Sequence, residues 1–581
     1  MRAWKKVQAV VFLLGALAGG AFAQAQTVTQ TQPQPGNSPA SPVTTVNQAV
    51  DRIIGREHDE IATIRHYTPI VETYIQDMKP DKDMGAVPVH DHYFLGQANL
   101  LSGIVDESMI GRKKGKFDAL NPFAHMGGIF TSDFVPEGFL QMIYIDTSGF
   151  DRMHYQFDYI GREFLGEVRC LVFDLRPLPK SGRGRFNGRI WVEDQDFTIV
   201  RFNGVYTPVG GLNGYKLHFD SWRLNVQPGL WLPSFIFSQE SDLNEFLGDK
   251  IHFKAQTHLW GYDLKNVGHQ SEFSELTIES PTAIQDQSTQ FLDRSPIESE
   301  REWQHQAEVN VIDRLQRTGL LAPAGPVDKV LETVVNNIEV TNNLDIEPDV
   351  HCRVLLTGTL ESFTIGHTIV LSRGLLDVLP DEASLATMLA QELADIIVTK
   401  PSTDQWGFND TTNVTTIEAL SHFSFRDTPD QIQLASTKAL ELLKNSPYKD
   451  KLGNAGLFLK QLDADSKFLS ALINPHLGNR VLLASALMTS APQLQPDKLD
   501  QIAALPIGSR IKVDPWSGRA DLVKAKPVPL LSPREKMPFE VTPFMPYLTR
   551  YQKPGTVPPV TTPKADVAKK DQEPAQQQQP Q

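Results

Sequence analysis

Three side chains within residues 391–395 have the types and spacing of a chemical site. Gln391 and Asp395 are four residues apart, which places them on one helix face, and Glu392 lies between them. One side-chain oxygen each from Gln391 and Asp395 could converge on a cation, with Asp430 as a third donor. Such oxygen ligands suit Mg²⁺ or Ca²⁺ better than Zn²⁺. The alternative is that all three form hydrogen bonds within the protein, because a buried Glu392 needs a compensating partner.

Segments on both sides of the pentad QELAD (391–395) carry a resemblance. The strand-and-turn sequence SFTIGHTIVLSRGLLD (362–377) and the helix start PDEA (380–383) precede it, and ALELL (439–443) follows it. In this order and spacing they resemble HtpX-like zinc metallopeptidases (family M-48), from about Glu308 to Ala484. In that family the pentad is H-E-x-x-H, whose two His bind zinc while the Glu activates the bound water.

The resemblance implies a degenerate site. Gln391 and Asp395 occupy the positions of the two His ligands, and the register of ALELL puts Leu434 at the third ligand. Only Glu392, the general base, is retained. We therefore expect no zinc, no other cofactor and no hydrolysis, although an active metalloendopeptidase with atypical ligands stays an alternative.

Peptide binding is a second implication of the resemblance. Active relatives hold their substrate as an added strand along the edge that precedes the zinc helix. The tentative peptide-binding edge of this chain comprises Phe363, Ile365, Ile369 and Leu371. The chain could in this way still bind peptides although it no longer hydrolyses them.

Two further residue pairs could carry chemistry. His90 and His92 share a strand face and could hold a metal, but no further ligands are evident, and a polar edge strand is the alternative. Cys170 and Cys352 lie in apolar segments, which favours buried free thiols over a disulfide.

Composition and the N-terminus indicate where the chain works. The net charge of −14 argues against nucleic-acid binding. Residues 1–23 have a charged start, an apolar core and an A-x-A cleavage site, which predicts a secretory signal peptide and an exported, periplasmic or secreted protein. No later apolar run approaches the roughly 20 residues of a membrane span. Residues 24–45 and 555–581 are polar and predict a disordered linker and tail.

The elements predict an α+β protein of two main domains. A helix at 46–66 precedes many strands, such as the hairpin GRIWVEDQDFTIVRF (188–202), which predicts a curved antiparallel half-barrel over 46–280. Its layout resembles outer-membrane lipoprotein-sorting proteins of the LolA/LolB type, which implies an apolar cavity for acyl chains; a filled core is the alternative. A mainly helical, metallopeptidase-like domain is expected over 300–495.

The C-terminal part becomes rich in proline. Residues 496–554 predict an extended arm, and its aromatics, among them Phe539 and Phe544, suggest that it packs back on the body. We expect the two domains to have separate cores, joined between about Leu276 and Glu300.

These features favour an exported pseudopeptidase that binds protein or lipoprotein clients in cell-envelope maintenance without cutting them. The alternatives are a lipid or acyl-chain carrier that works through the N-terminal sheet, and the active metalloendopeptidase.

Overall fold

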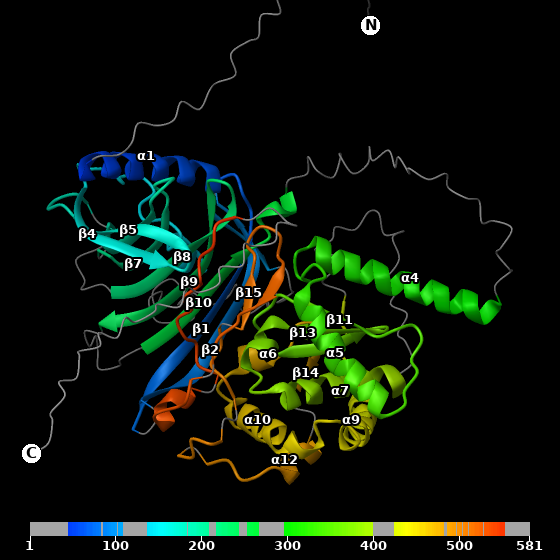
Figure 1. Cartoon of the computed structure of the whole chain (residues 1–581). Helices are drawn as coiled ribbons and strands as arrows, with labels where there is room; N and C mark the ends of the chain where they lie inside the picture. The colour runs from blue at the N-terminus through cyan, green and yellow to red at the C-terminus, as the bar shows by residue number, and fades with distance from the viewer. Residues whose placement is uncertain are drawn as a thin grey trace, which may run out of the picture. The chain divides into compact units, whose positions relative to one another are not determined.

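The structure is a computed structural model (Figure 1). It describes residues 45–82, 85–100, 103–108, 136–182, 184–207, 216–242, 252–265, 295–398, 423–481, 485–495, 497–501, 504–508, 510–526, 528–537 and 539–551. The predicted signal peptide, most of the linker and the tail lie outside these residues, and so does most of the predicted junction at 276–300.

An antiparallel sheet dominates the first half of the chain. Ten strands of the described residues form it, in the order β3-β2-β1-β10-β9-β8-β7-β6-β5-β4, and it is not closed into a barrel. Its strands are β1 (Ile70–Asp81), β2 (Gly85–Asn99), β3 (Gly103–Ser108), β4 (Tyr155–Leu165), β5 (Val168–Pro177), β6 (Phe186–Glu193), β7 (Ile199–Tyr206), β8 (Lys216–Gln227), β9 (Leu230–Asp242) and β10 (His252–Trp260). The predicted hairpin is confirmed, because β6 pairs with β7 and the carboxylate of Glu193 accepts the turn N–H groups of Gln195 and Asp196 at 2.9 and 2.6 Å.

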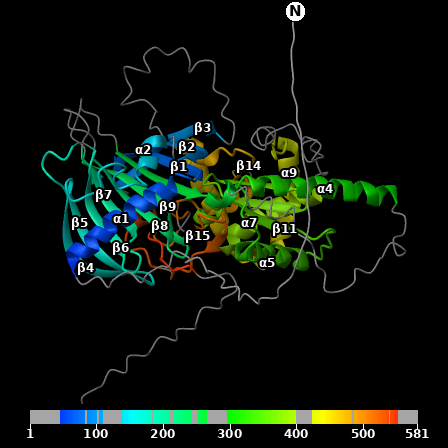
Figure 2. The same cartoon turned by 90° about the horizontal axis from the view of Figure 1, so that it is seen from above.

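The helix α1 (Val46–Ile64) covers one face of this sheet (Figures 1 and 2). Its Glu57 forms a fully buried, two-pronged ion pair with Arg223 of β8, both bonds being 2.7 Å long. On the same face the rings of Phe186, Phe202 and Phe219 pack edge to face at 5.8–5.9 Å between centroids. Aromatic side chains are therefore closely packed on this part of the face.

Helices and a small sheet make up most of the second half. The helical elements are α4 (Pro296–Arg317), α5 (Pro326–Thr341), α6 (Arg373–Val378), α7 (Glu382–Val398), α9 (Pro429–Lys444), η5 (Lys449–Lys451), α10 (Leu452–Asp465), α11 (Ser470–Ile473) and α12 (Ser485–Ser490). Four short strands, β11 (His351–Leu355), β12 (Glu361–Ile365), β13 (Thr368–Ser372) and β14 (Asn479–Arg480), form a sheet in the order β11-β13-β12-β14. The remaining elements are α2 (Pro136–Gln141), η2 (Tyr262–Lys265), β15 (Ile511–Val513), β16 (Ala520–Leu522) and η7 (Pro533–Lys536). The mixed α+β fold predicted from the sequence is confirmed.

Both halves contribute to one hydrophobic core. Trp222 and Trp260 of the large sheet belong to the same buried cluster as Leu371 and Leu393 of the helical half. The expectation of separate cores is therefore wrong, because the large sheet buries its second face against the helical half. Each sheet nevertheless takes its described strands from one half, so the position of the domain boundary stays a prediction.

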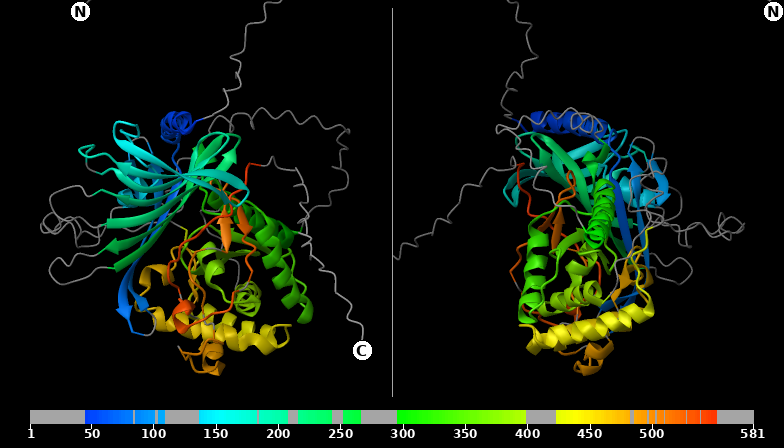
Figure 3. Two further views of the ribbon diagram at one scale, coloured as in Figure 1. Left: turned by 60° about the vertical axis from the view of Figure 1, so that its left-hand side comes forward. Right: turned by 90° about the vertical axis from the view of Figure 1, so that its right-hand side faces the viewer.

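The last described segment, 539–551, crosses the face of the large sheet that lies opposite α1 (Figure 3). It contacts several strands and turns of the sheet half. The contacting groups are the side chains of Gln76, Lys254, Phe235, Glu193 and Asn225 and the backbone N–H of Glu167. Phe544, for instance, packs edge to face on Phe235 at 5.5 Å. Within the described residues, no helix combines the length and the apolar character that crossing a membrane requires.

Candidate functional site

The pentad 391–395 lies on α7, which begins after Asp381. The carboxylate of Asp381 accepts the backbone N–H of Ser384 at 2.8 Å, so Asp381 is the N-cap of the helix. The helix runs beside β12 and α9, so the pentad 391–395 faces side chains from both.

Glu392 is buried in this arrangement, with 2% of its surface exposed. The hydroxyl of Ser362 on β12 donates a hydrogen bond of 2.6 Å to its Oε1. Burial raises the pKa of Glu392 to about 8, and the negative charges of Asp395 and Asp427 act in the same direction, against the Ser362 bond. The carboxyl is therefore mainly protonated at neutral pH and is a poor general base.

The two other pentad side chains also have partners within the protein. Ser436 of α9 donates to the amide oxygen of Gln391 at 3.0 Å, and Thr364 of β12 donates to Asp395 at 2.9 Å. A cavity of about 20 Å³ remains among them, room for about one water molecule. Its lining residues are Ser362, Thr387, Met388, Gln391, Glu392, Asp395, Asp427, Ile432, Asn479, Arg480 and Val481.

The donors at this site do not fit zinc. The helix offers an amide oxygen and two carboxyl groups in place of imidazoles, and a hydroxyl already holds each of them. Asp430 is exposed at the start of α9, away from the cavity lining. In the part of the chain that the structure describes, no three His, Cys, Asp or Glu side chains gather in a metal-binding group, and this includes His90 and His92.

The assignment of Leu434 to the third ligand position is wrong. Its side chain is 55% exposed and does not line the cavity. The α9 residues that face the pentad are Ile432, which lines the cavity, and Ser436, which binds Gln391. These two are one helical turn apart, whereas Leu434 lies two residues from each and points to another side. The apolar pattern of 439–443 fixed the helix but not which of its faces meets α7.

The predicted peptide-binding edge needs a correction as well. Ile369 and Leu371 lie on β13, which is an inner strand between β11 and β12, so they are not on an edge. Phe363 and Ile365 do lie on β12, but β14 pairs with its first two residues. All four side chains are buried, and the ring of Phe363 stacks on Phe425 at 4.7 Å.

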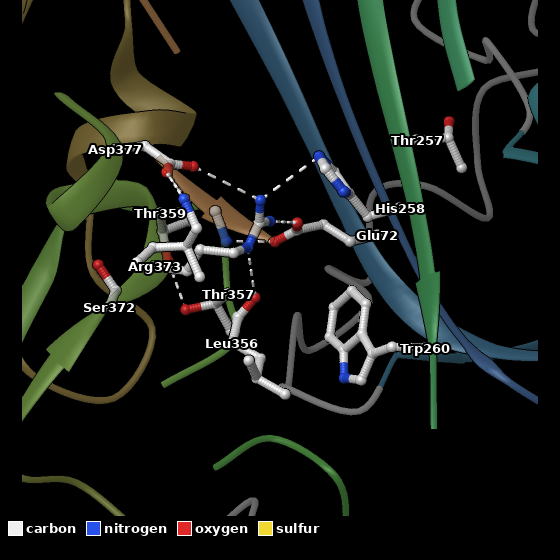
Figure 4. Close-up of polar contacts among 12 residues, drawn as sticks. Glu72, Thr257, His258, Trp260, Leu356, Thr357, Thr359, Ser372, Arg373 and Asp377 are labelled. Atoms are coloured by element: carbon white, nitrogen blue, oxygen red, sulfur yellow. Dashed lines mark hydrogen bonds and ion pairs between the residues drawn. The ribbon is translucent and has the colours of Figure 1, made fainter. Parts of the chain in front are cut away.

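A second polar cluster, around Arg373, joins the two halves of the molecule (Figure 4). Arg373 starts α6 and is 1% exposed. Its guanidinium forms an ion pair with Glu72 of β1, donates to the carbonyl of Leu356 at 3.0 Å and lies 3.7 Å from Asp377. Glu72 also accepts the backbone N–H of Gly358 and, at 2.8 Å, the hydroxyl of Tyr93.

The backbone brings these groups together where the start of α6 approaches the bend at Gly358. A Cβ atom on Gly374 would lie 2.0 Å from the carbonyl oxygen of Gly358, so only glycine fits beside Arg373. His258 of β10 lies 3.4 Å from the guanidinium, and burial together with the Arg373 charge lowers its pKa well below the usual value. The cavity beside them measures about 20 Å³, and the cluster therefore serves as a buried link between α6 and the large sheet.

Sequence reasoning missed this cluster, although a signal was present. Arg373 is the one charged residue in the apolar run IVLSRGLL (369–376), and a buried charge in such a run requires a buried partner. Glu72, in the apolar start of β1, carries the same signal. Nothing in the sequence pairs the two, because 301 residues separate them.

Comparison with known proteins gives little further guidance. No protein-family model matches the chain, and neither does any curated protein. Among solved structures, the chain is similar to a domain from Vibrio parahaemolyticus that is provisionally described as an outer membrane lipoprotein-sorting protein. The sequence identity is 11%, the match covers 36% of this chain and 91% of that chain, and the TM-score is 0.18. A similarity at this level assigns neither a family nor a function.

Proposed function

We propose that the protein is an exported, non-hydrolytic binding protein of the cell envelope, a pseudopeptidase that holds protein or lipoprotein clients. The observation that carries this proposal is the state of Glu392. Its carboxyl accepts a hydrogen bond from Ser362, and burial raises its pKa to about 8. The cavity beside it, about 20 Å³, is too small for a peptide to enter. A general base needs access to the water that it activates, and Glu392 lacks that access.

Client binding has support at an edge of the large sheet. The strand β4 ends the sheet, and no strand of the described residues pairs with its outer side. Three large apolar side chains on it, Tyr159, Ile160 and Phe164, are exposed. An extended client segment can add to such an edge through backbone hydrogen bonds while its side chains cover the apolar surface.

The test combines a binding assay and a cleavage assay on the mature chain. With a permanently unfolded model protein we expect association without fragments, with or without added zinc. Charges at the edge, in the variant Ile160→Glu/Phe164→Glu, should weaken association at least tenfold, about 1.4 kcal/mol. The matched control Val340→Glu alters an apolar residue that is exposed elsewhere, on α5, and should not. Zinc-dependent cleavage that is lost in Glu392→Gln would contradict the proposal, and so would equal association of all three proteins.

A further inference from the structure

A cavity of about 300 Å³ lies where the start of β2, the end of α10 and the C-terminal arm meet. This volume is at the lower end of the range for small-molecule sites, roughly 300–1,000 Å³. We call it the β2–α10 cavity. Its lining residues are Ala86, Val87, Pro88, Val89, Gln461, Asp465, Phe468, Leu469, Leu494, Gln495, Gln501, Ala504, Arg534, Lys536, Met537 and Glu540.

The walls of the β2–α10 cavity are largely apolar. Val87 and Val89 come from the strand, Leu469 from the segment after α10, and Met537 from the arm. Phe468 also lines the cavity, yet 44% of its surface is exposed. Contact of an apolar wall and an aromatic ring with water is unfavourable. Covering them with an apolar group lowers the free energy. Met537 adds a flexible side chain that adapts to the shape of an occupant.

Three of the four charged side chains of the lining have partners of their own. Glu540 forms an ion pair with Lys254, which is outside the lining. Asp465 accepts a hydrogen bond of 2.6 Å from Gln461, and Arg534 donates to the backbone carbonyl of Lys82 at 3.3 Å.

Lys536 has spare capacity to bind an anion. Its ammonium group donates to the backbone carbonyl of Gln495 over a long 3.4 Å, and that acceptor carries no formal charge. Asp497 and Asp500 act on it only as charges at longer range, and burial lowers its pKa. A carboxylate or phosphate within hydrogen-bond distance would provide a much stronger, charge-assisted partner.

We propose that the β2–α10 cavity binds a single-chain anionic amphiphile of the fatty-acid type. The acyl chain lies against Val87, Leu469 and Phe468, and the anionic head group binds Lys536. The cavity accommodates one chain of medium length, because its volume is small. This site is distinct from the pentad, from the aromatic face under α1 and from the β4 edge, so it stands or falls independently of the proposed function.

The experiment is calorimetric titration of the mature protein with dodecanoate, dodecanol and dodecylammonium. We expect dodecanoate to bind with one site per chain and more tightly than either analogue. Lys536→Gln should weaken dodecanoate binding roughly tenfold, the worth of one charge-assisted hydrogen bond, and leave dodecanol unchanged. Lys467→Gln, a matched change at an exposed neighbouring lysine that does not line the cavity, should have no effect.

Filling the cavity provides the second arm. Val87→Trp, or Leu494→Trp if the first variant melts early, should abolish binding of dodecanoate and dodecanol alike. Undiminished binding in a folded filled variant would place the acyl chain elsewhere and overturn the proposal. Equal affinity for dodecanoate and dodecylammonium would overturn the anionic head group, and no binding of dodecanoate would overturn the site as a whole.

Discussion

Burial decides what the carboxyl of Glu392 can do. Among the residues that the structure describes, the hydroxyl of Ser362 is the one hydrogen-bond donor to that carboxyl, and the charges of Asp395 and Asp427 oppose its ionisation. A buried carboxyl with one neutral donor and two acidic neighbours keeps its proton. At the scale of single residues, Glu392 is therefore a buried, mainly protonated acid that is held by Ser362.

Replacing this glutamate should make stability less dependent on pH. The pKa of Glu392 is about 8 in the folded protein and about 4.3 in an unfolded chain, so the folded state binds more protons between these values. Stability that is fully present below about pH 4.3 is lost as the pH rises through 8. Glu392→Gln keeps the neutral shape, and at about pH 8.5 it should be more stable than the wild type, by up to about 5 kcal/mol.

Urea unfolding at several pH values measures this difference. The gain should shrink toward zero below about pH 3.5, where the carboxyl is protonated in both the folded and the unfolded state. Glu300→Gln, on the exposed part of α4, is the matched control and should follow the wild type at every pH. A constant difference between Glu392→Gln and wild type over the whole range would rule out the buried-acid account.

Arg373 presents the opposite case, a buried cation that is matched by carboxylates. Arg373→Met leaves Glu72 and Asp377 buried without their counter-charge, and we expect a loss of about 3–5 kcal/mol in the free energy of unfolding. Adding Glu72→Gln should recover part of the loss, since an amide still accepts from Gly358 and Tyr93. The double-mutant cycle in urea measures the coupling, and a single-variant loss below about 1 kcal/mol would contradict the assignment.

At the scale of elements, the sequence patterns predicted single helices and strands correctly, but they did not predict which elements contact one another. The helix predicted at 46–66 is α1 at Val46–Ile64, and its predicted apolar stripe is buried at Val50, Ile53 and Ile61. A period of 3.6 residues is a property of the segment alone, so the sequence displays it. The two-residue strand β14 has no such period, and its pairing with β12 depends on chain geometry more than 100 residues away.

The rotation of α9 about its axis is the clearest example, and it leads to a prediction about restored zinc ligands. The variant Gln391→His/Asp395→His should gain zinc-dependent stability when combined with Ile432→Glu, because these three positions line one cavity. The same pair combined with Leu434→Glu should not, since Leu434 is exposed.

Melting curves with zinc and with a chelator compare the two triple variants. Without zinc the Ile432→Glu variant should be the less stable one, because its new carboxylate is buried without a partner. A zinc-induced rise in Tm for the Leu434→Glu variant alone would restore the sequence-based register and refute the orientation of α9 in the structure.

At the scale of the whole molecule, the large sheet is a partition with different contents on its two faces. Aromatic rings and α1 occupy one face, and the shared core, the Arg373 cluster and the arm occupy the other. The alternation of side chains along β1 delivers Glu72, Tyr74 and Gln76 to the second face, where they bind Arg373, Asp91 and the backbone of Phe539. The spacing of apolar residues predicted a strand-rich half and a helix-rich half. The sequence of an amphipathic strand does not show which other segment will cover its apolar face.

A shared core predicts that the two halves unfold together. Separating them would expose Trp222 and Trp260 on one side and Leu371 and Leu393 on the other, and it would leave the Glu72–Arg373 pair broken. That cost makes a half-folded molecule rare at equilibrium, so we expect one calorimetric transition. The unfolding curves from tryptophan fluorescence, mainly a probe of the large sheet, and from helical circular dichroism should superimpose.

In Arg373→Met/Phe544→Ala, which loses the buried ion pair and an arm contact with Phe235, the two curves should separate. Leu531→Ala, an exposed residue of the preceding segment, is the control and should keep them together. Two resolved transitions in the wild type would show that the halves are independent domains after all.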